Sequence, residues 1–355
     1  MDATQHNTEL LSMFAHPAFL VKDGIIIAAN KAAQDLQITE STSVSDILAS
    51  GQDEYKAFST GTLSLTVSTG PVSAIAAVVR TGDFDYFHLS RIGENSDLRT
   101  LALASQQLRD PLTNISALAE SLIPNETEAL SEKDQARVAL FHQNLHRILR
   151  LVGNMSDSYN CTERVYNMEH LNICAVITDA VHNTQQLLDK SAAKLTFTSN
   201  DNSVISLADH SLLGRAVYNM LSNAIRFADP NSEIIANLRV NPRTVCFTVE
   251  NDCQKFTSDQ LGTMFFRYRR VPTITDGGCG LGLGIPMIQA IASAHNGSLL
   301  ATIPEPGKVR FCLSLPIRKS TTGILRDSLL RPDYTGGYDH GLIELSDVLP
   351  SDAYK

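Results

Sequence analysis

A glycine-spaced loop and two upstream asparagines have the residue types of a nucleotide site. Gly278, Gly280 and Gly282 space a loop that leads into an apolar helical pattern. Glycine lets backbone N–H groups approach phosphate oxygens, and the helix N-terminus adds the positive end of its dipole. Asn219 and Asn223 stand four residues apart on a predicted helix, so both amide oxygens share a face that suits Mg²⁺ or its waters. The pattern predicts a site for magnesium and phosphates.

The elements around these residues follow from the apolar periodicity of residues 168–317. An aromatic and basic stretch at 264–270 lies between the asparagines and the glycine loop, where it could fold over a nucleotide. Period-3.6 patterns predict helices, and short apolar runs between turns predict strands. The segment is therefore expected to form an α/β sandwich with helices at 212–227 and 285–294 and strands at 234–240, 244–250, 297–302 and 309–315.

A heptad-like seam occupies residues 96–158. Apolar residues recur at three- and four-residue steps on both sides of a break near Pro124. This spacing predicts two helices in an antiparallel hairpin, and two hairpins would form a four-helix bundle in a dimer. The seam residues are Leu101, Ala104, Leu108, Ile115, Leu118 and Leu122, then Val138, Phe141, Leu145, Ile148, Val152 and Met155.

The first 92 residues alternate short apolar runs with turns. Two runs flank Asp23-Gly24, which predicts a β-hairpin, and Asn30 is placed to cap the helix that follows. Three further strands are expected at 63–67, 72–79 and 84–90. The stretch resembles a small PAS sensor domain. The alternative is an unrelated α+β packing module.

Composition and charge narrow the class of protein. The chain has 355 residues, 43% of them hydrophobic, which predicts two or three globular domains. A net charge of −9 disfavours nucleic acid as a partner, and the basic residues of 264–270 are better placed to contact phosphate or the hairpin. No apolar run is long enough to span a membrane, and residues 1–11 lack the pattern of a signal peptide. We therefore expect a cytoplasmic protein with reduced cysteines.

Taken together, the motifs resemble the ATP-binding domain of sensor histidine kinases, the GHKL group. The asparagine motif NMLSNAIRF, the aromatic segment and the second glycine box occur in the family's order over about 100 residues. The resemblance implies that the cofactors are ATP and Mg²⁺. By position it assigns Mg²⁺ to Asn223 with Asn219 beside it, a phosphate contact to Arg226, part of the adenine pocket to Phe227, and the phosphate cradle to Gly278, Gly280 and Gly282.

The first glycine box departs from the family pattern. Where DxGxG is expected, the chain has Asn251, Asp252, Cys253, Gln254 and Lys255. Asn251 keeps a carbonyl acceptor for the adenine amino group and loses the charge of the family aspartate. Both glycines are replaced, so ATP affinity is expected to fall, although Lys255 could instead reach a phosphate.

The hairpin carries a second departure. Its first helix contains ASQQLRDPLTNI, which resembles the family pattern SHELRTPL. Gln106 replaces the phosphoacceptor histidine, Gln107 replaces the acidic residue, and Asp110 replaces threonine. An amide is a poor nucleophile and glutamine cannot act as a base, so the family's autophosphorylation is predicted to be absent. A glutamine that orients water leaves phosphatase activity open, and His142 and His146 on the second helix are alternative acceptors or packing residues.

The sequence therefore predicts a multidomain α+β protein of two-component signalling, read as a pseudokinase that binds ATP. The alternative is an active histidine kinase with a non-standard acceptor, or a response-regulator phosphatase. Expected partners are a second copy or another histidine kinase in a dimer, with a response regulator as a further candidate. The domains expected are a PAS-like sensor at 1–92, the hairpin at 93–160, the GHKL domain at 165–317 and an acidic extension at 318–355, which could dock on the ATP-binding domain or on a partner.

Overall fold

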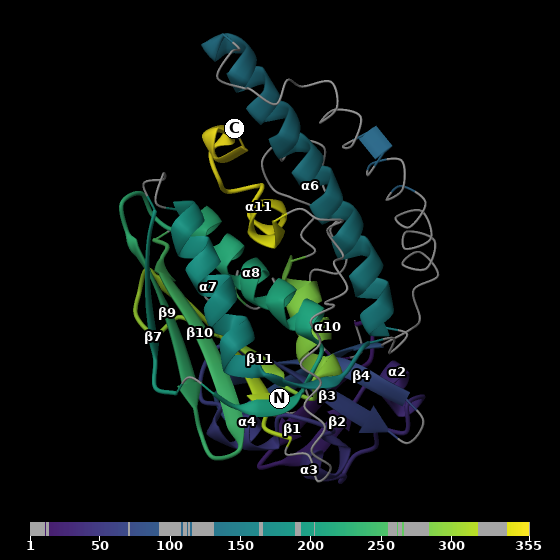
Figure 1. Ribbon diagram of the computed structural model, residues 1–355. Coiled ribbons are helices and arrows are strands. Elements are labelled where there is room, and N and C mark those ends of the chain that lie inside the picture. The colour runs from purple at the N-terminus through teal and green to yellow at the C-terminus, as the bar shows by residue number, and fades with distance from the viewer. Residues whose placement is uncertain are drawn as a thin grey trace. The chain divides into compact units, whose positions relative to one another are not determined.

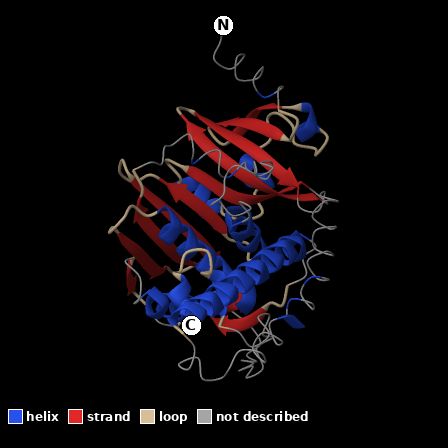
Figure 2. Cartoon of the chain, turned by 90° about the horizontal axis from the view of Figure 1, so that it is seen from above, coloured by secondary structure: helices blue, strands red, loops and turns tan. Residues whose placement is uncertain are grey.

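The computed structural model describes most of the chain and divides it into two compact units. Unit 1 comprises Met1–Glu94, Asn241–Thr248 and Cys253–Pro316, and unit 2 comprises Asn95–Val240, Val249–Asp252 and Ile317–Lys355. The protein is α+β, as the mixture of helices and strands in Figure 2 shows, and both units contain helices and strands. The described residues are 11, 14–69, 72–91, 108, 112, 114–115, 131–162, 166–188, 193–201, 203–254, 261, 265, 284–318 and 339–354.

The N-terminal part of unit 1 forms the hairpin and strands expected from the sequence. The Asp23-Gly24 turn has positive φ angles at both residues, 50° and 77°, and connects β1 to its antiparallel neighbour β2. Asn30 Oδ1 accepts a hydrogen bond from Ala33 N and caps α2 as expected. The elements are β1 (Ala18–Lys22), β2 (Ile25–Ala29), α2 (Lys31–Gln34), α3 (Val44–Ile47), α4 (Gln52–Ala57), β3 (Thr62–Thr69), β4 (Val72–Thr81) and β5 (Phe84–Arg91).

The sheet of unit 1 continues from these N-terminal strands into strands of the C-terminal half. Its order is β2-β1-β5-β4-β3-β11-β12-β10, and β3 pairs antiparallel with β11. Side chains reinforce the junction, because Ser50 Oγ donates to Gly297 O at 3.2 Å and Thr66 Oγ1 lies 2.7 Å from Ser293 Oγ. The C-terminal elements are β10 (Thr244–Asp252), α10 (Gly284–Ala294), β11 (Ser298–Thr302) and β12 (Lys308–Pro316).

Unit 2 is built on three long helices, drawn in teal and green in Figure 1. They are α6 (Glu132–Thr162), α7 (Ile173–Leu188) and α8 (His210–Phe227). Strand β7 (Lys194–Ser199) pairs parallel with β9 (Glu233–Val240), and β6 (Glu169–Asn172) pairs antiparallel with β8 (Ile205–Ala208). The helices and strands expected at 212–227, 234–240, 244–250, 285–294, 297–302 and 309–315 are thus confirmed within about two residues at each end.

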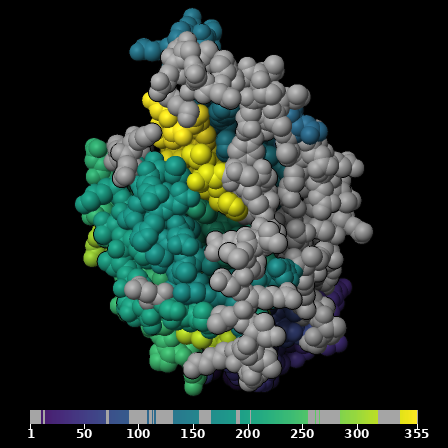
Figure 3. Space-filling view, in the orientation of Figure 1, coloured from purple at the N-terminus to yellow at the C-terminus, as the bar shows by residue number. Residues whose placement is uncertain are grey.

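The acidic extension has structure of its own at the end of the chain. Residues 339–354 contain α11 (His340–Glu344) and the 3₁₀ helix η2 (Ser351–Tyr354), which pack against α6, α7 and α8 within unit 2. In the space-filling view these residues are yellow and lie beside teal atoms of the same unit (Figure 3). Among the described helices, none combines the length and apolar composition needed to cross a membrane. The four domain boundaries expected from the sequence stay a prediction.

Candidate functional site

Helix α8 carries the predicted asparagine motif and presents it on one face. Asp209 caps the helix by accepting a hydrogen bond from Leu212 N at 3.0 Å. Residues spaced by three or four positions share a helix face, so four polar side chains form one stripe. The stripe consists of Arg215, Asn219, Ser222 and Arg226. This face of α8 contacts α6 and residues 339–354.

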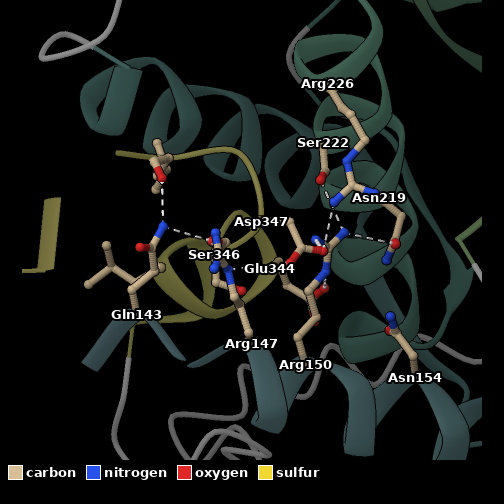
Figure 4. Close-up of polar contacts among 12 residues, drawn as sticks. Gln143, Arg147, Arg150, Asn154, Asn219, Ser222, Arg226, Glu344, Ser346 and Asp347 are labelled. Atoms are coloured by element: carbon tan, nitrogen blue, oxygen red, sulfur yellow. Dashed lines mark hydrogen bonds and ion pairs between the residues drawn. The ribbon is translucent and has the colours of Figure 1, made fainter. Parts of the chain in front are cut away.

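Asn219 is held rigidly in the interior of unit 2. Only 1% of it is exposed, its Nδ2 donates to Arg215 O at 2.9 Å, and its Oδ1 accepts from Arg150 Nη2 at 3.3 Å (Figure 4). The same Arg150 nitrogen donates to Ser222 Oγ at 3.1 Å. The Arg150 guanidinium of α6 therefore binds the α8 face at Asn219, the residue expected beside the magnesium ligand Asn223.

Asn223 and Phe227 lie at the more open part of α8. Asn223 is half-buried, and its side chain makes no hydrogen bond within the described residues. The ring of Phe227 is 42% exposed. An open amide and an open aromatic ring near the helix end could both receive a ligand.

Asn251 lies in the last residues of β10, close to the loop that follows α8. Its side chain is buried, and Nδ2 donates to Asp252 O at 3.2 Å. Asp252 O also accepts from Asp229 N at 2.9 Å, which ties this strand end to the loop after α8 within unit 2. The structure thus brings Asn251 toward the end of the helix that carries Asn223.

Cys253, where the resemblance led us to expect the first glycine of the box, follows the end of β10. Its side chain is buried, and its backbone N–H donates to Gly307 O at 2.7 Å. The remaining predicted residues, Gln106, Gln107, Lys255 and the glycines Gly278, Gly280 and Gly282, lie outside the described residues. Of the aromatic segment 264–270, only Phe265 is described, and it is buried.

Two arginines, Arg150 and Arg215, and the two acids that face the α8 stripe were not identified from the sequence, whereas Arg226 was. Arg215 Nε lies 2.9 Å from Glu344 Oε1, and Arg226 Nη2 lies 3.0 Å from Asp347 Oδ2. Arg150 Nη1 lies 2.9 Å from the same Asp347 oxygen. Burial lowers the pKa of Arg150, and the charges of Glu344 and Asp347 oppose that change. An arginine within an apolar helix seam is the signal that could have pointed to a partner acid.

The two histidines of α6 are packing residues in this structure. His146 is buried, and its ring lies 5.3 Å from that of Tyr354. Nδ1 of His142 lies 3.3 Å from Tyr354 O. Both histidines thus contact Tyr354, and whether either accepts a phosphoryl group stays a prediction.

Comparison with known proteins identifies the class of the domain that carries the α8 motif. Residues 208–319 match the family described as histidine kinase-, DNA gyrase B-, and HSP90-like ATPase, so this part of the chain is a domain of that class. Over a longer stretch the chain is similar to sensor histidine kinases. It is 28% identical over 219 residues to the heme sensor protein HssS of Staphylococcus haemolyticus, and 26% identical over 226 residues to the sensor-like histidine kinase SenX3 of Mycolicibacterium smegmatis.

These alignments cover 60% and 61% of this chain and 45% and 56% of the relatives, so the chain spans about half of their length. Among solved structures, full-length ShkA in complex with AMPPNP superposes with a TM-score of 0.49 at 16% identity, covering 62% of this chain and 46% of that one. ThkA in complex with response regulator protein TrrA superposes with a TM-score of 0.41 at 14% identity, covering 87% and 98%.

Proposed function

We propose that this protein is a two-component signalling protein that binds ATP with Mg²⁺ and does not phosphorylate itself. The observation that carries the proposal is the placement of Asn219, Asn223 and Arg226 on one helix inside the region matched to the ATPase class. Gln106 in place of the phosphoacceptor histidine supports the second half of the proposal, since its amide cannot serve as the nucleophile.

The two asparagines of α8, Asn219 and Asn223, differ in how freely their amides could bind magnesium. The amide of Asn219 already uses its oxygen and its nitrogen inside the protein, whereas the half-buried amide of Asn223 makes no hydrogen bond within the described part of the chain. Amide oxygen is a suitable ligand for Mg²⁺. We assign the magnesium contact to Asn223, a phosphate contact to Arg226 and a positioning role to Asn219. Gly278, Gly280 and Gly282 complete the phosphate site, and Asn251 accepts from the adenine.

The partner in the proposed assembly is a second histidine-kinase-like hairpin. Leu140, Phe141 and Ile148 are exposed on α6, while the seam residues Leu145 and Val152 are buried. An exposed apolar stripe on a helix of the expected dimerisation hairpin favours a homodimer or a heterodimer with another histidine kinase. The hairpin would also present its surface to a response regulator, and residues 1–92 would serve as the PAS-like sensor.

Binding of a fluorescent ATP analogue with and without Mg²⁺ tests the nucleotide site. Asn223→Ala is expected to weaken the magnesium-dependent binding, because one ligand oxygen is removed. The control is Asn144→Ala, which removes an exposed amide of α6 that bonds only to Leu140 O of its own helix among the described residues. Equal affinities of the two variants would argue against the assignment of Asn223.

Restoring the acceptor tests the second half of the proposal. The double substitution Gln106→His, Gln107→Glu returns a nucleophile and an adjacent base to the helix. Acid-labile labelling of this variant and not of the native chain would place the defect in the hairpin. Labelling in neither protein, with nucleotide binding intact, would place a defect in the ATP-binding domain.

A further inference from the structure

The C-terminal residues 339–354, called here the terminal segment, are folded as part of unit 2. Asp339 caps α11 by accepting from Gly341 N at 2.6 Å and from Leu342 N at 3.2 Å. Leu345, Leu349 and Tyr354 are buried, and the Tyr354 hydroxyl donates to Leu342 O at 2.7 Å. The segment therefore has its own cap and its own apolar anchors.

Helix α6 holds this segment mainly through backbone carbonyls. Gln143 Nε2 donates to Leu349 O at 2.8 Å and to Ser346 O at 3.2 Å, and Arg147 Nε donates to Ser346 O at 3.1 Å (Figure 4). If the segment moves away, the buried amide of this glutamine loses a hydrogen-bond acceptor. An unpaired buried amide lowers the free energy of unfolding. These contacts fix the path of the segment along α6.

Two acids of the segment bind the arginines of the α8 face. Glu344 is completely buried and lies 2.9 Å from Arg215 Nε and 3.6 Å from Arg150 Nε. Asp347 lies 3.0 Å from Arg226 Nη2 and 2.9 Å from Arg150 Nη1. Charge-assisted contacts of this kind are stronger than neutral hydrogen bonds. The segment thus places a carboxylate on Arg226, the arginine to which the proposed nucleotide site assigns a phosphate contact.

The two acids differ in how easily water or a ligand could replace them. The pair of Glu344 and Arg215 is sealed, with side-chain exposures of 0% and 1%. The pair of Asp347 and Arg226 has exposures of 26% and 24%. A phosphate group entering from solvent would meet Arg226 with a carboxylate already bound to it. Glu344 is therefore the structural anchor, and Asp347 is the exchangeable contact.

We propose that the terminal segment is an internal competitor of the nucleotide phosphates, with Asp347 as the group that the phosphate displaces from Arg226. This inference rests on the proposed function of the α8 face. While Asp347 is bound, Arg150 also remains on Asn219 and Ser222, so α6 and α8 are held together. Nucleotide binding and docking of the segment weaken each other by the same factor, since coupling between two ligands is reciprocal.

The test uses the full-length chain and the variant Asp347→Asn, which removes the competing charge and keeps the side-chain size. The affinity for AMP-PNP with Mg²⁺ is expected to rise by about two- to fivefold, the upper part of the range for a partly exposed ion pair such as that of Asp347 with Arg226. Asp352→Asn is the matched control, because it makes the same charge change at an exposed position of the same segment. It is expected to leave the affinity unchanged. Thermal unfolding of each variant verifies that it is folded.

Hydrogen exchange of residues 339–354 provides a readout that a merely structural role would not move. Saturating AMP-PNP and Mg²⁺ are expected to speed exchange in the terminal segment of the native chain. Unchanged exchange together with equal affinities of native chain and Asp347→Asn would overturn the competition and leave the proposed nucleotide site standing. Absence of binding in the native chain and in both variants would instead overturn the proposed function itself, and the competition with it.

Discussion

At the scale of single residues, the pair of Arg215 and Glu344 joins two buried side chains of opposite charge in unit 2. Gly153 makes room for it, because a Cβ at that position would lie 2.8 Å from Arg215 Nη2. A buried charge is costly when its partner is removed, whereas the intact pair contributes little by itself. The main effect of the pair is therefore to fix the position where the terminal segment docks. Its net contribution to the free energy of unfolding is small.

Neutralising Glu344 is expected to destabilise the protein strongly. Glu344→Gln leaves the charge of Arg215 uncompensated and should lower the free energy of unfolding by about 3–5 kcal/mol, measured by urea denaturation. Glu305→Gln breaks the exposed pair with Lys308 and should cost less than about 1 kcal/mol. Similar losses in the two variants would contradict the interpretation of Glu344 as a buried anchor.

His88 of β5 gives unit 1 a pH dependence. Burial, together with the charge of His16, whose ring lies 5.6 Å away, lowers the pKa of His88 from 6.5 to about 4. Between pH 6.5 and pH 4, His88 is therefore protonated in the unfolded chain and neutral in the folded chain. The free energy of unfolding is expected to fall by up to about 3 kcal/mol as the pH drops from about 6.5 to about 4.

Urea denaturation at pH 7 and pH 5 measures this effect. His88→Gln should reduce the difference between the two conditions, because the titrating group is gone. The control His182→Gln replaces an exposed histidine of α7 and should preserve the difference. If the two variants respond equally to pH, the source of the pH dependence lies elsewhere.

At the scale of elements, the pairing of β3 with β11 depends on a glycine. Gly61 has a φ of +95°, and a Cβ there would lie 2.1 Å from Ala301 O. Gly61→Ala is expected to lower the free energy of unfolding by about 2–4 kcal/mol, since the clash is with backbone and the conformation is strained. Gly24 has a similar φ of +77°, but a Cβ there would have no atom within 4 Å. Gly24→Ala should therefore lower the free energy of unfolding by only about 1 kcal/mol. Equal costs would mean that close packing against β11 is unimportant.

The exposed stripe of α6 predicts how the chain associates. Ile148→Glu is expected to convert a dimer to a monomer in light scattering after size exclusion, because a charge enters the proposed apolar interface. Ile205→Glu makes the same change on β8, where the side chain is 41% exposed compared with 43% for Ile148. This control should remain dimeric. A dimer that survives Ile148→Glu would place the interface off this stripe.

Local patterns predicted most elements, because turn chemistry and apolar periodicity act within a few residues. The Asp23-Gly24 hairpin, the cap at Asn30 and helix α8 are confirmed. The pairing of Leu300 with Leu63 was not predicted, because residues so far apart in the sequence leave no local signal of their contact. The seam of α6 was predicted from its spacing alone, which did not indicate that Phe141 and Ile148 are exposed while Leu145 and Val152 are buried.

At the scale of the whole molecule, the candidate site was predicted in part. The type and spacing of Asn219 and Asn223 identified the right helix, since both residues belong to one short motif. Arg150, Glu344 and Asp347 were missed because each finds its partner on another element. The acids of the extension had no motif in sequence, and their role is visible only where the extension contacts α6 and α8.

In the proposed function, the protein binds nucleotide on α8 and does not transfer phosphate to itself. Incubation of the purified full-length chain with γ-labelled ATP and Mg²⁺, followed by acid treatment, tests this claim most directly. We expect that a fluorescent ATP analogue binds and that no acid-labile label appears on the protein. Label that is lost in acid would contradict it, and would mean that a histidine such as His142 or His146 leaves its packed position to accept the phosphoryl group.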